Sequence, residues 1–339
     1  MPENLTPRQI VKQMLQGSLP ARPLFLPIVF SLGARLENLP LRGFLGNATK
    51  ISNSLRQIRG HLRSDGVACY FDSSLELEAL GGTLCWDAEN QPPTVHWPSA
   101  TSRGALPSGL RTPEETAKAG RVPVATDVIR RLKSQLQGEP LLMAAVTGPF
   151  TLAARLTELE GESALRAEDI PESALALAAS VMREVAAALV EAGADAIFIQ
   201  EAILPGLSAA EADAWASTLA PTFNVIRFYE ALPVLLLTDS RSFAESSAVI
   251  LQRPWDCVVC PALDVDSCIS LRGTPQPSGV TLGVALGAGT LDAAGSGKLG
   301  PSLDPLLAEW RPILITTAGD VPVTTDMKRL IKVGEEVRR

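Results

Sequence analysis

The chain has 339 residues, of which 46% are hydrophobic and 20% charged, and its formal net charge is −7. This composition predicts a folded protein with a sizeable core, excludes global disorder and argues against a nucleic-acid-binding surface. No apolar run reaches the roughly 18 residues of a membrane span. The first 17 residues contain no apolar signal core, so we expect a cytoplasmic protein with no membrane partner.

Short apolar runs alternate with segments long enough for helices along the whole chain. The predicted strands are 24–30, 66–72, 141–148, 196–201, 233–239, 257–262, 280–285 and 313–318. The predicted helices are 6–16 (within an N-terminal helical segment, 1–20), 47–63, 114–136 with a break near 120–123, 171–192, 209–230, 243–251 and a last basic helix ending near Arg338.

Two stretches interrupt this alternation. Residues 82–113 are rich in Pro, Gly, Trp and Ser and predict an irregular excursion after the second strand, with a hairpin through 94–97. The glycine-rich stretch 287–300 predicts a mobile loop. It is not a phosphate-binding P-loop, because Lys298 is not followed by Ser or Thr, and no G-x-G-x-x-G follows the first strand.

The fold class follows from the order of the elements. Strands that are separated by helix-sized connections form a parallel sheet, and eight such units favour a closed (β/α)8 TIM barrel over an open doubly wound sheet. A chain of this length fits one such barrel, which typically needs about 250 residues. We therefore expect a single α/β domain spanning residues 1–339.

The cysteines and histidines do not suggest a metal or redox centre. Five cysteines in a chain without a secretory signal are expected to be reduced thiols. Cys257 and Cys260 form a C-x-x-C, but they lie in a predicted strand, whose alternation would place them on opposite faces. His61 and His96 fall in a charged helix and a loop, where surface positions are expected.

Acidic residues follow several predicted strands, at the end of a barrel where catalytic groups are found. They are Asp72, Glu201, Asp239 and Asp320. Four such acids could position a cation or polar groups. The alternative for Asp72 is that it only caps the following segment, since an Asp before a turn or helix start is common.

Arginines lie close to the same strand ends, at positions 35, 42, 155 and 241. A guanidinium binds a substrate carboxylate through two parallel hydrogen bonds, so these residues are candidates for substrate binding. Structural ion pairs with the neighbouring acids are the alternative. Neither histidine falls at a strand end, so no Ser-His-Asp arrangement is available.

Four stretches, in order along the chain, resemble landmarks of one protein family: FDSSLELEALGG, TGPFTLAARL, ALVEAGADAIFIQEA and ITTAGDVPVTT. They are similar to motifs of the uroporphyrinogen decarboxylase superfamily, which also contains cobalamin-linked methyltransferases acting on coenzyme M and on methoxy compounds. The resemblance covers nearly the whole chain. It implies a single (β/α)8 barrel, which the strand count predicts separately.

The decarboxylase branch implies a role for several of the strand-end residues. Asp72 stands nine residues before Gly81, as the central acid of the family does, and it would stabilise a protonated pyrrole while an acetate carboxylate leaves. Arg35 matches an arginine of the family, and Arg155 stands where the family has a tyrosine. Arg35 and Arg155 would hold substrate carboxylates, with Glu201 and Asp239 as further substrate-binding candidates.

This first reading therefore implies removal of acetate carboxylates from a tetrapyrrole, without a cofactor. It also implies a homodimer. Three family positions depart from the decarboxylase pattern, since an expected arginine falls on Ser31, the expected tyrosine on Arg155 and an expected histidine on Ala318.

The methyltransferase branch implies different chemistry. Glu76 and Glu78 match its E-x-E-A-L-G pattern, and its members use zinc to activate a thiol and transfer methyl groups to or from a corrinoid protein. Where that branch has its zinc ligands, this chain has Thr238-Asp239-Ser240 and Asp320. A zinc site is therefore not expected, and Asp239 and Asp320 are at most candidates for binding a harder divalent cation.

We place the tetrapyrrole decarboxylase first, because Asp72 is present whereas the zinc ligands are missing. A corrinoid-linked methyltransferase with an altered or absent zinc site is the alternative. A third hypothesis is a barrel that binds a tetrapyrrole without catalysis.

Overall fold

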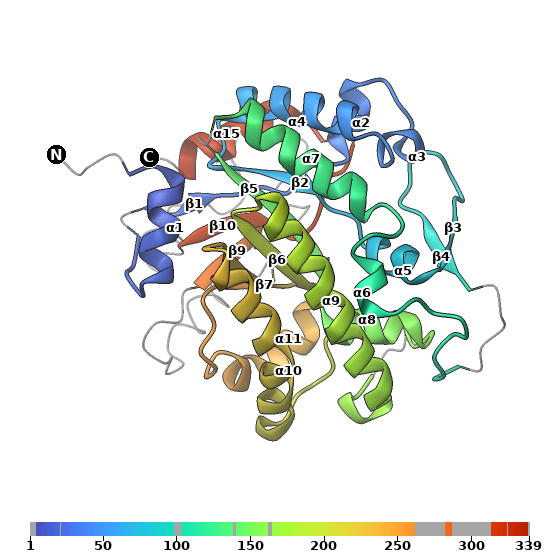
Figure 1. Ribbon diagram of the computed structural model, residues 1–339. Coiled ribbons are helices and arrows are strands. Elements are labelled where there is room, and N and C mark those ends of the chain that lie inside the picture. The colour runs from blue at the N-terminus through green and yellow to red at the C-terminus, as the bar shows by residue number, and fades with distance from the viewer. Residues whose placement is uncertain are drawn as a thin grey trace.

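The computed structural model describes residues 5–20, 22–97, 103–137, 140–161, 165–261, 282–286, 313–323 and 325–337. Eight parallel strands form one sheet in the order β1-β10-β9-β8-β7-β6-β5-β2. They are β1 (Leu24–Phe25), β2 (Gly66–Tyr70), β5 (Leu141–Thr147), β6 (Ala196–Glu201), β7 (Leu232–Leu237), β8 (Val258–Cys260), β9 (Leu282–Leu286) and β10 (Leu314–Thr317). The sheet curls into a nearly closed barrel surrounded by helices, which confirms the predicted fold class (Figure 1).

The helices agree closely with the periodicity of the sequence. They are α1 (Pro7–Leu15), α2 (Leu32–Leu36), α3 (Leu41–Phe44), α4 (Ala48–Leu62), α5 (Leu75–Leu80), α6 (Pro113–Thr116), α7 (Val122–Gln135), α8 (Pro149–Leu156), α9 (Glu172–Ala192), α10 (Ala209–Phe228), α11 (Ser240–Ile250) and α15 (Met327–Val337). The predicted break between α6 and α7 is present. The predicted excursion holds a two-stranded antiparallel hairpin of β3 (Thr83–Cys85) and β4 (Thr94–His96). The glycine-rich stretch 287–300 lies outside the described residues.

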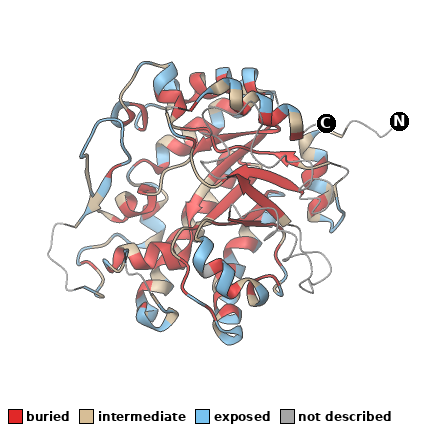
Figure 2. Cartoon of the chain, turned by 180° about the vertical axis from the view of Figure 1, so that it is seen from behind, coloured by how far each residue is buried: buried red, intermediate tan, exposed pale blue. Residues whose placement is uncertain are grey.

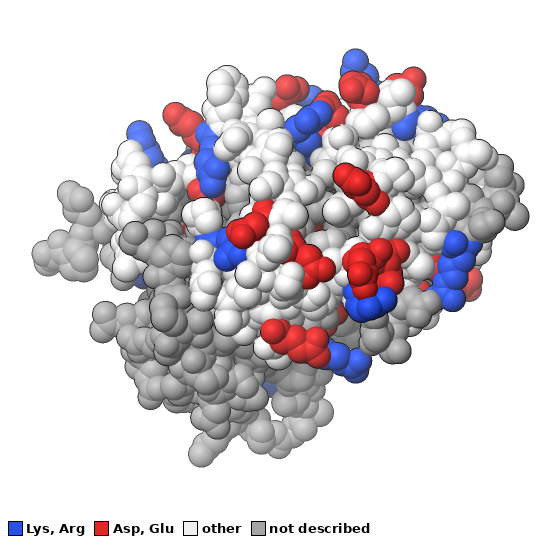
Figure 3. All heavy atoms as spheres, turned by 90° about the horizontal axis from the view of Figure 1, so that it is seen from below, with Lys and Arg blue, Asp and Glu red and all other residues white. Residues whose placement is uncertain are grey.

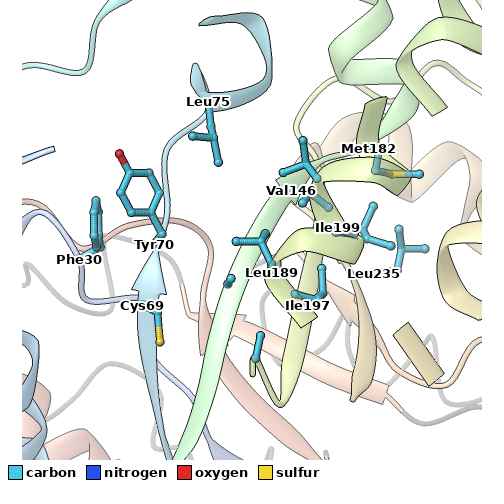
Figure 4. Close-up of a cluster of buried hydrophobic side chains, with 14 of the residues drawn as sticks. Phe30, Cys69, Tyr70, Leu75, Val146, Met182, Leu189, Ile197, Ile199 and Leu235 are labelled. Carbon is cyan, nitrogen blue, oxygen red and sulfur yellow. The ribbon is translucent and has the colours of Figure 1, made fainter. Parts of the chain in front are cut away.

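Two apolar layers hold the barrel together, and the strands are buried on both faces (Figure 2). Along β6, Ala196 and Phe198 belong to the core inside the barrel, whereas Ile197 and Ile199 belong to the core between barrel and helices. Figure 4 shows Ile197 and Ile199 on the same side as Met182 of α9. This period of two decides which side chains can reach the inside of the barrel.

Helix α1 covers the end of the barrel at which the strands begin. Its Ile10, Val11 and Met14 are buried in the inner core, so the amphipathic face predicted from sequence closes the barrel floor. In Figure 1, α1 lies at the left, while α5, α8 and the β3–β4 hairpin lie at the right, beyond the ends of the strands. The candidate site must therefore lie on the right-hand side of that view.

Helix α9 is long and apolar enough to cross a membrane by length and composition alone. In this fold it packs against α8, α10 and β5, and nine of its residues are buried, which is typical of a core helix in a barrel. On the described part of the face seen from below, acidic and basic side chains are interspersed among uncharged areas (Figure 3).

The barrel has a seam between β1 and β2, which are the two ends of the sheet order. Asp65, the residue before β2, bridges it. Its carboxylate accepts two hydrogen bonds from Arg22 at 2.8 and 2.7 Å and one from the backbone N–H of Phe25 at 2.9 Å. The backbone N–H of Asp65 donates to the Phe25 carbonyl at 3.0 Å. One buried side chain thus joins the two edge strands.

Candidate functional site

The residues predicted at the strand ends do lie together at one end of the barrel, but most of their charges are satisfied by the protein itself. Asp72 follows β2, and its side chain is almost fully buried. Its carboxylate forms an ion pair with Nη1 of Arg121 at 2.6 Å. It also accepts hydrogen bonds from the backbone N–H and the hydroxyl of Ser74, at 3.0 and 2.7 Å. Asp72 therefore shapes the turn before α5 and neutralises a buried cation.

Arg121 is the residue that inspection of the sequence missed. It stands immediately before α7, and its Nε donates to Glu78 at 2.7 Å while Nη2 donates to the Ser74 hydroxyl at 2.9 Å. Burial alone lowers the pKa of an arginine, but the charge of Asp72 and the hydrogen bond that Arg121 donates to Glu78 outweigh it and raise the pKa of Arg121 above its ordinary value. The guanidinium stays charged, and two carboxylates share it.

Glu76 and Glu78, the two acids of the E-x-E-A-L-G pattern, point in different directions. Glu78 pairs with Arg121, as above. Glu76 is fully buried and accepts hydrogen bonds at 2.9 Å from both the backbone N–H and the hydroxyl of Thr147, the last residue of β5. Burial raises the pKa of Glu76. The two acids therefore connect α5 to its neighbours: Glu78 to the start of α7, and Glu76 to the end of β5.

Glu201 has no solvent exposure. It continues the outward-facing side of β6, and its carboxylate accepts hydrogen bonds from the backbone N–H groups of Phe150 and Thr151, from the Thr151 hydroxyl and from the Trp215 indole, at 2.6 to 3.2 Å. Burial raises its pKa to about 7. The carboxylate caps the start of α8, and the hydrogen bonds that it accepts come from the protein itself; the substrate-binding role expected for Glu201 stays a prediction.

Asp320 and Asp239 also bind backbone groups. The carboxylate of Asp320 accepts hydrogen bonds at 2.8 Å from the N–H groups of Phe30 and Ser31, and burial raises its pKa to about 6. It thereby holds the chain after β1 against the chain after β10. Asp239 accepts a hydrogen bond at 3.0 Å from the N–H of Arg241 in the first turn of α11.

The two arginines expected to bind carboxylates lie in different surroundings. Arg155 is largely buried beside the Asp72 turn, donating from Nη1 to the Ser73 carbonyl at 3.0 Å and pairing with Glu160 at 3.2 Å. Arg35 is exposed, and its Nη1 donates to the Val323 carbonyl at 2.7 Å. It lines a surface pocket of about 480 Å³. Neither this hydrogen bond nor this pocket involves Asp72 or Arg121.

Neutral side chains line the inside of the barrel at the end where the strands finish, which we call the upper end. Phe71, Ala145 and Ala318 pack on the inner core. Gln200 shares the inner face of β6 with Ala196 and Phe198, is partly exposed, and its side chain has no hydrogen-bond partner among the described residues. An accessible amide beside apolar side chains can orient a neutral ligand by hydrogen bonding.

The donor groups in the described part of the chain do not fit a zinc ion. Within the described part of the chain, no group of three His, Cys, Asp or Glu side chains could hold a metal. The carboxylates of Asp239 and Asp320 accept backbone hydrogen bonds at 3.0 Å or less. Cys257 and Cys260 belong to the inner and the outer core respectively, as the strand alternation predicts. We assign no metal-dependent step.

Comparison with known proteins gives consistent matches. The family model described as uroporphyrinogen decarboxylase (URO-D) matches residues 6–232. A methylated-thiol–coenzyme M methyltransferase of Methanosarcina mazei is 34% identical over 90 residues, which span 26% of this chain and only 23% of that protein.

Solved structures support the fold. A methyltransferase from Methanosarcina mazei is 16% identical, with a TM-score of 0.71 over 99% of both chains. A B12-independent methionine synthase from Shewanella sp. W3-18-1 is 14% identical, with a TM-score of 0.53 over 88% of this chain and 89% of that chain. At these identities the structural matches show the barrel alone.

Proposed function

Because the chain belongs to the uroporphyrinogen decarboxylase family, we propose that it is a methyltransferase acting on a small molecule, with a corrinoid as the other substrate. This reverses the order of the two hypotheses drawn from the sequence. The sequence match to a methylated-thiol–coenzyme M methyltransferase supports methyl transfer, although it covers a minor part of both proteins. A corrinoid protein is the partner that this activity would require.

The ion pair of Asp72 is the observation that carries the proposal. A decarboxylase of this family would need the carboxylate in the cleft to stabilise a cationic pyrrole, and that stabilisation depends on an uncompensated negative charge. Here Arg121 neutralises the carboxylate at 2.6 Å, and Ser74 occupies its other oxygen. A pyrrole cation placed beside this pair would meet a fixed positive charge as well as a negative one.

The neutral lining of the upper barrel supports the same choice. A substrate with several carboxylates needs several available arginines, whereas Arg155 is engaged by Ser73 and Glu160. Phe71, Ala145 and Gln200 instead suit a small uncharged or singly charged compound. In our proposal the apolar side chains exclude water from the methyl group, and the Gln200 amide orients the molecule that carries or receives it.

Methyl transfer from methylcobalamin to a thiol tests the proposal directly. Purified protein is mixed with methylcobalamin and coenzyme M under anaerobic conditions. The carbon–cobalt bond breaks with its electron pair remaining on cobalt, the thiol loses its proton to solvent, and a carbon–sulfur bond forms. We expect the visible spectrum to change to that of cob(I)alamin in step with methylated thiol detected by mass spectrometry. An unchanged spectrum with several methylated donors and thiols would contradict the proposal.

Decarboxylation is retained as a second candidate, because Asp72 occupies the position of the family's central acid. In a parallel reaction the protein is incubated with uroporphyrinogen, and stepwise loss of carboxylates is followed by mass spectrometry. Turnover here, together with no methyl transfer, would replace our proposal by the decarboxylase. Binding of the tetrapyrrole without turnover in either reaction would favour the non-catalytic barrel.

A further inference from the structure

The hydroxyl of Thr151 lies between the start of α8 and the end of β6. Thr151 is the third residue of α8, and its side chain is buried. Its Oγ1 donates to the Glu201 carboxylate at 2.6 Å and accepts hydrogen bonds from the backbone N–H groups of Ala202 and Ile203 at 2.9 and 3.0 Å. A hydroxyl has one proton and two lone pairs, so all of them are used here. These four residues form one connected group, which we call the Thr151 junction.

The Glu201 carboxylate in this junction is surrounded by hydrogen-bond donors. Besides the Thr151 hydroxyl they are three N–H groups, namely the backbone amides of Phe150 and Thr151 and the indole of Trp215. Packing also fixes the carboxylate, since a Cβ at Gly148 would clash with it. An O–H···O distance of 2.6 Å is typical of a bond to a charged oxygen. The arrangement of donors therefore suits the ionised form of Glu201.

The junction holds the segment of chain that carries Gln200. The carbonyl of Gln200 accepts a hydrogen bond from the N–H of Gly148 at 2.8 Å, and that of Glu201 accepts one from the N–H of Thr238 at 3.0 Å. Successive side chains of a strand point to opposite faces, so anchoring Glu201 on the outer face fixes the direction in which Gln200 points inward. A rotation of the chain after Glu201 would therefore move the Gln200 amide.

We propose that Thr151 is a positioning residue, whose hydroxyl holds the end of β6 so that the Gln200 amide meets the substrate in one orientation. This inference rests on the proposed function, in which Gln200 orients the molecule that carries or receives the methyl group. The hydrogen bonds of the Thr151 hydroxyl are made within the chain, so we assign it no contact with substrate and expect it to act through Gln200. A shift of about 1 Å in an orienting group can cost about 100-fold in rate, so the effect is measurable.

A proton on Glu201 would disrupt the junction. Of the groups that contact this carboxylate within the described residues, only Thr151 Oγ1 can accept a hydrogen bond. The Thr151 hydroxyl would then turn to the Ile203 carbonyl, 3.4 Å away, and one of the two N–H groups would lose its acceptor. Burial raises the pKa of Glu201 to about 7, so the junction should loosen as pH falls below that value.

Neighbouring charges should leave this titration undisturbed. Strands β5 and β7, on either side of β6, carry no charged residue. Charged side chains of α8, α9 and α10 are engaged with other partners, in the pairs Arg155–Glu160, Arg183–Glu184, Glu191–Tyr229, Glu211–Ser208, Asp213–Arg253 and Arg227–Asp256. Glu172 is exposed at the start of α9. Burial and the surrounding hydrogen bonds therefore set the pKa of Glu201.

Removal of the hydroxyl tests the proposal in the methyl-transfer reaction at about pH 8, where Glu201 is ionised. Thr151→Val replaces the hydroxyl by a methyl group and should raise KM for the small substrate about fivefold, whereas Thr151→Ser keeps it and should stay within about twofold of wild type. Thr157→Val is the matched control, since the buried Thr157 hydroxyl donates to the Ala153 carbonyl within α8 at 2.8 Å. An unchanged KM in Thr151→Val, or an equal rise in Thr157→Val, would overturn the proposal.

The pH profile of the wild type tests the same point without a substitution. KM should rise about fivefold as pH falls from about 8 to about 6, because Glu201 takes up its proton in this range. In Thr151→Val the junction is already broken, so KM should change less than about twofold over the same range. Equal pH profiles of the two proteins would contradict the role of Thr151.

A double variant shows whether Thr151 acts through Gln200. Once Gln200 is replaced by Leu, positioning it no longer matters, so Thr151→Val should add less than about twofold to the KM of Gln200→Leu. Independent effects would multiply instead, and that result would overturn the proposal. Circular dichroism of each variant confirms that the barrel is intact.

The junction can also be examined without methyl transfer. In Thr151→Val, hydrogen exchange at the Ala202 and Ile203 amides should be at least about tenfold faster than in wild type or Thr157→Val, and the Gln200 side-chain amide should shift in the ¹H–¹⁵N spectrum. If the wild type transfers no methyl group, the proposed function fails, and these two measurements decide whether Thr151 positions Gln200. Unchanged exchange together with an unchanged Gln200 signal would overturn the inference.

Discussion

Arg121 reaches Asp72 through Nη1 and Glu78 through Nε, while its side chain is only 10% exposed. A cation at this depth is stable only because both carboxylates lie within hydrogen-bonding distance, and a buried pair that loses one member leaves the other charge uncompensated. Asp72 therefore stabilises the fold by neutralising Arg121, whatever chemistry takes place nearby. This contribution to the free energy of unfolding can be measured separately from activity.

Replacing Asp72 by Asn should destabilise the protein by about 2–3 kcal/mol, less than for a fully orphaned charge because Glu78 remains beside Arg121. The double variant Asp72→Asn with Arg121→Met should recover at least half of that loss, since it removes the cation as well. Urea unfolding of the single and double variants gives the coupling energy. Independent, additive effects would show that the ion pair does not stabilise the fold.

Gln200 is the side chain through which the proposed function can be examined most directly. Gln200→Leu should raise KM for the small substrate about tenfold, the worth of one hydrogen bond, with a smaller effect on kcat and on stability. Gln135→Leu, on the exposed end of α7, is the control and should leave both constants unchanged. An unaffected KM in Gln200→Leu would remove this residue from the site.

At the scale of elements, the seam between β1 and β2 sets the barrel apart from a fully hydrogen-bonded cylinder. The backbone ladder of β1 is short: only Leu24 and Phe25 are paired, and their partner strand is β10. The N–H of Leu26 still donates to the Ile315 carbonyl of β10 at 2.8 Å. Beyond Leu26 the acceptors are side chains: the N–H of Ile28 donates to the Thr317 hydroxyl, and that of Phe30 donates to Asp320. Side-chain oxygens thus accept hydrogen bonds that the backbone carbonyls of a neighbouring strand would otherwise accept.

Asp65→Asn should weaken the seam, because the neutral amide loses the paired hydrogen bonds of Arg22 and presents a donor to it. We expect a loss of about 2 kcal/mol in the free energy of unfolding and faster hydrogen exchange at the Phe25 amide. Asp127→Asn removes an exposed helical ion pair with Arg131 and should cost less than about 1 kcal/mol. Equal effects of the two variants would contradict a special role for Asp65.

The elements were largely predictable because their signals are local. Strands buried on both faces are continuous apolar runs, so all eight could be counted. The predicted strand 24–30 was too long, since the register of β1 covers only Leu24 and Phe25. Further on, the N–H groups of Ile28 and Phe30 donate to the side chains of Thr317 and Asp320, which are far away in the sequence. The alternation along β6 already assigns Glu201 to the outer face, a signal available in the sequence alone.

The candidate site was less predictable because its contacts are distant in sequence. Asp72 could be found from its place after a strand and from the family resemblance. Its partner Arg121 lies 43 residues beyond Glu78, at a helix start that no motif marks. The ion pair with Arg121 neutralises the Asp72 carboxylate and so changes the role that we propose for it. Whether the pair forms depends on how α5 and α7 pack, which only the folded barrel determines.

At the scale of the molecule, two buried acids should make stability depend on pH. The pKa of Glu201 is raised from 4.5 to about 7 and that of Asp320 from 3.8 to about 6, chiefly by burial. The folded state therefore binds these protons more tightly than the unfolded state does. Each group stabilises the protein fully below its unfolded pKa, and that contribution is lost as pH rises to about 7, at about 1.4 kcal/mol per pKa unit.

Urea unfolding between pH 4.5 and 7.5 checks this expectation. Glu201→Gln should lower stability most at pH 4.5 and flatten the decline towards pH 7.5. Glu211, whose pKa is lowered by hydrogen bonds from Ser208, is the control with the opposite sign, because its stabilising contribution is lost as pH falls. A Glu201→Gln variant with the wild-type pH dependence would show that Glu201 does not titrate in this range.

The sheet order has a consequence for the way the chain is made. From β2 through β10, each strand of the barrel pairs with the next one along the chain, so these strands can add to a growing open sheet as they leave the ribosome. Strand β1 emerges first, yet Leu24 pairs with Leu314, 290 residues later. A nascent chain that has not reached β10 therefore carries an unpaired apolar strand throughout its synthesis, and chaperones that bind such segments should recognise it until the last strand closes the barrel.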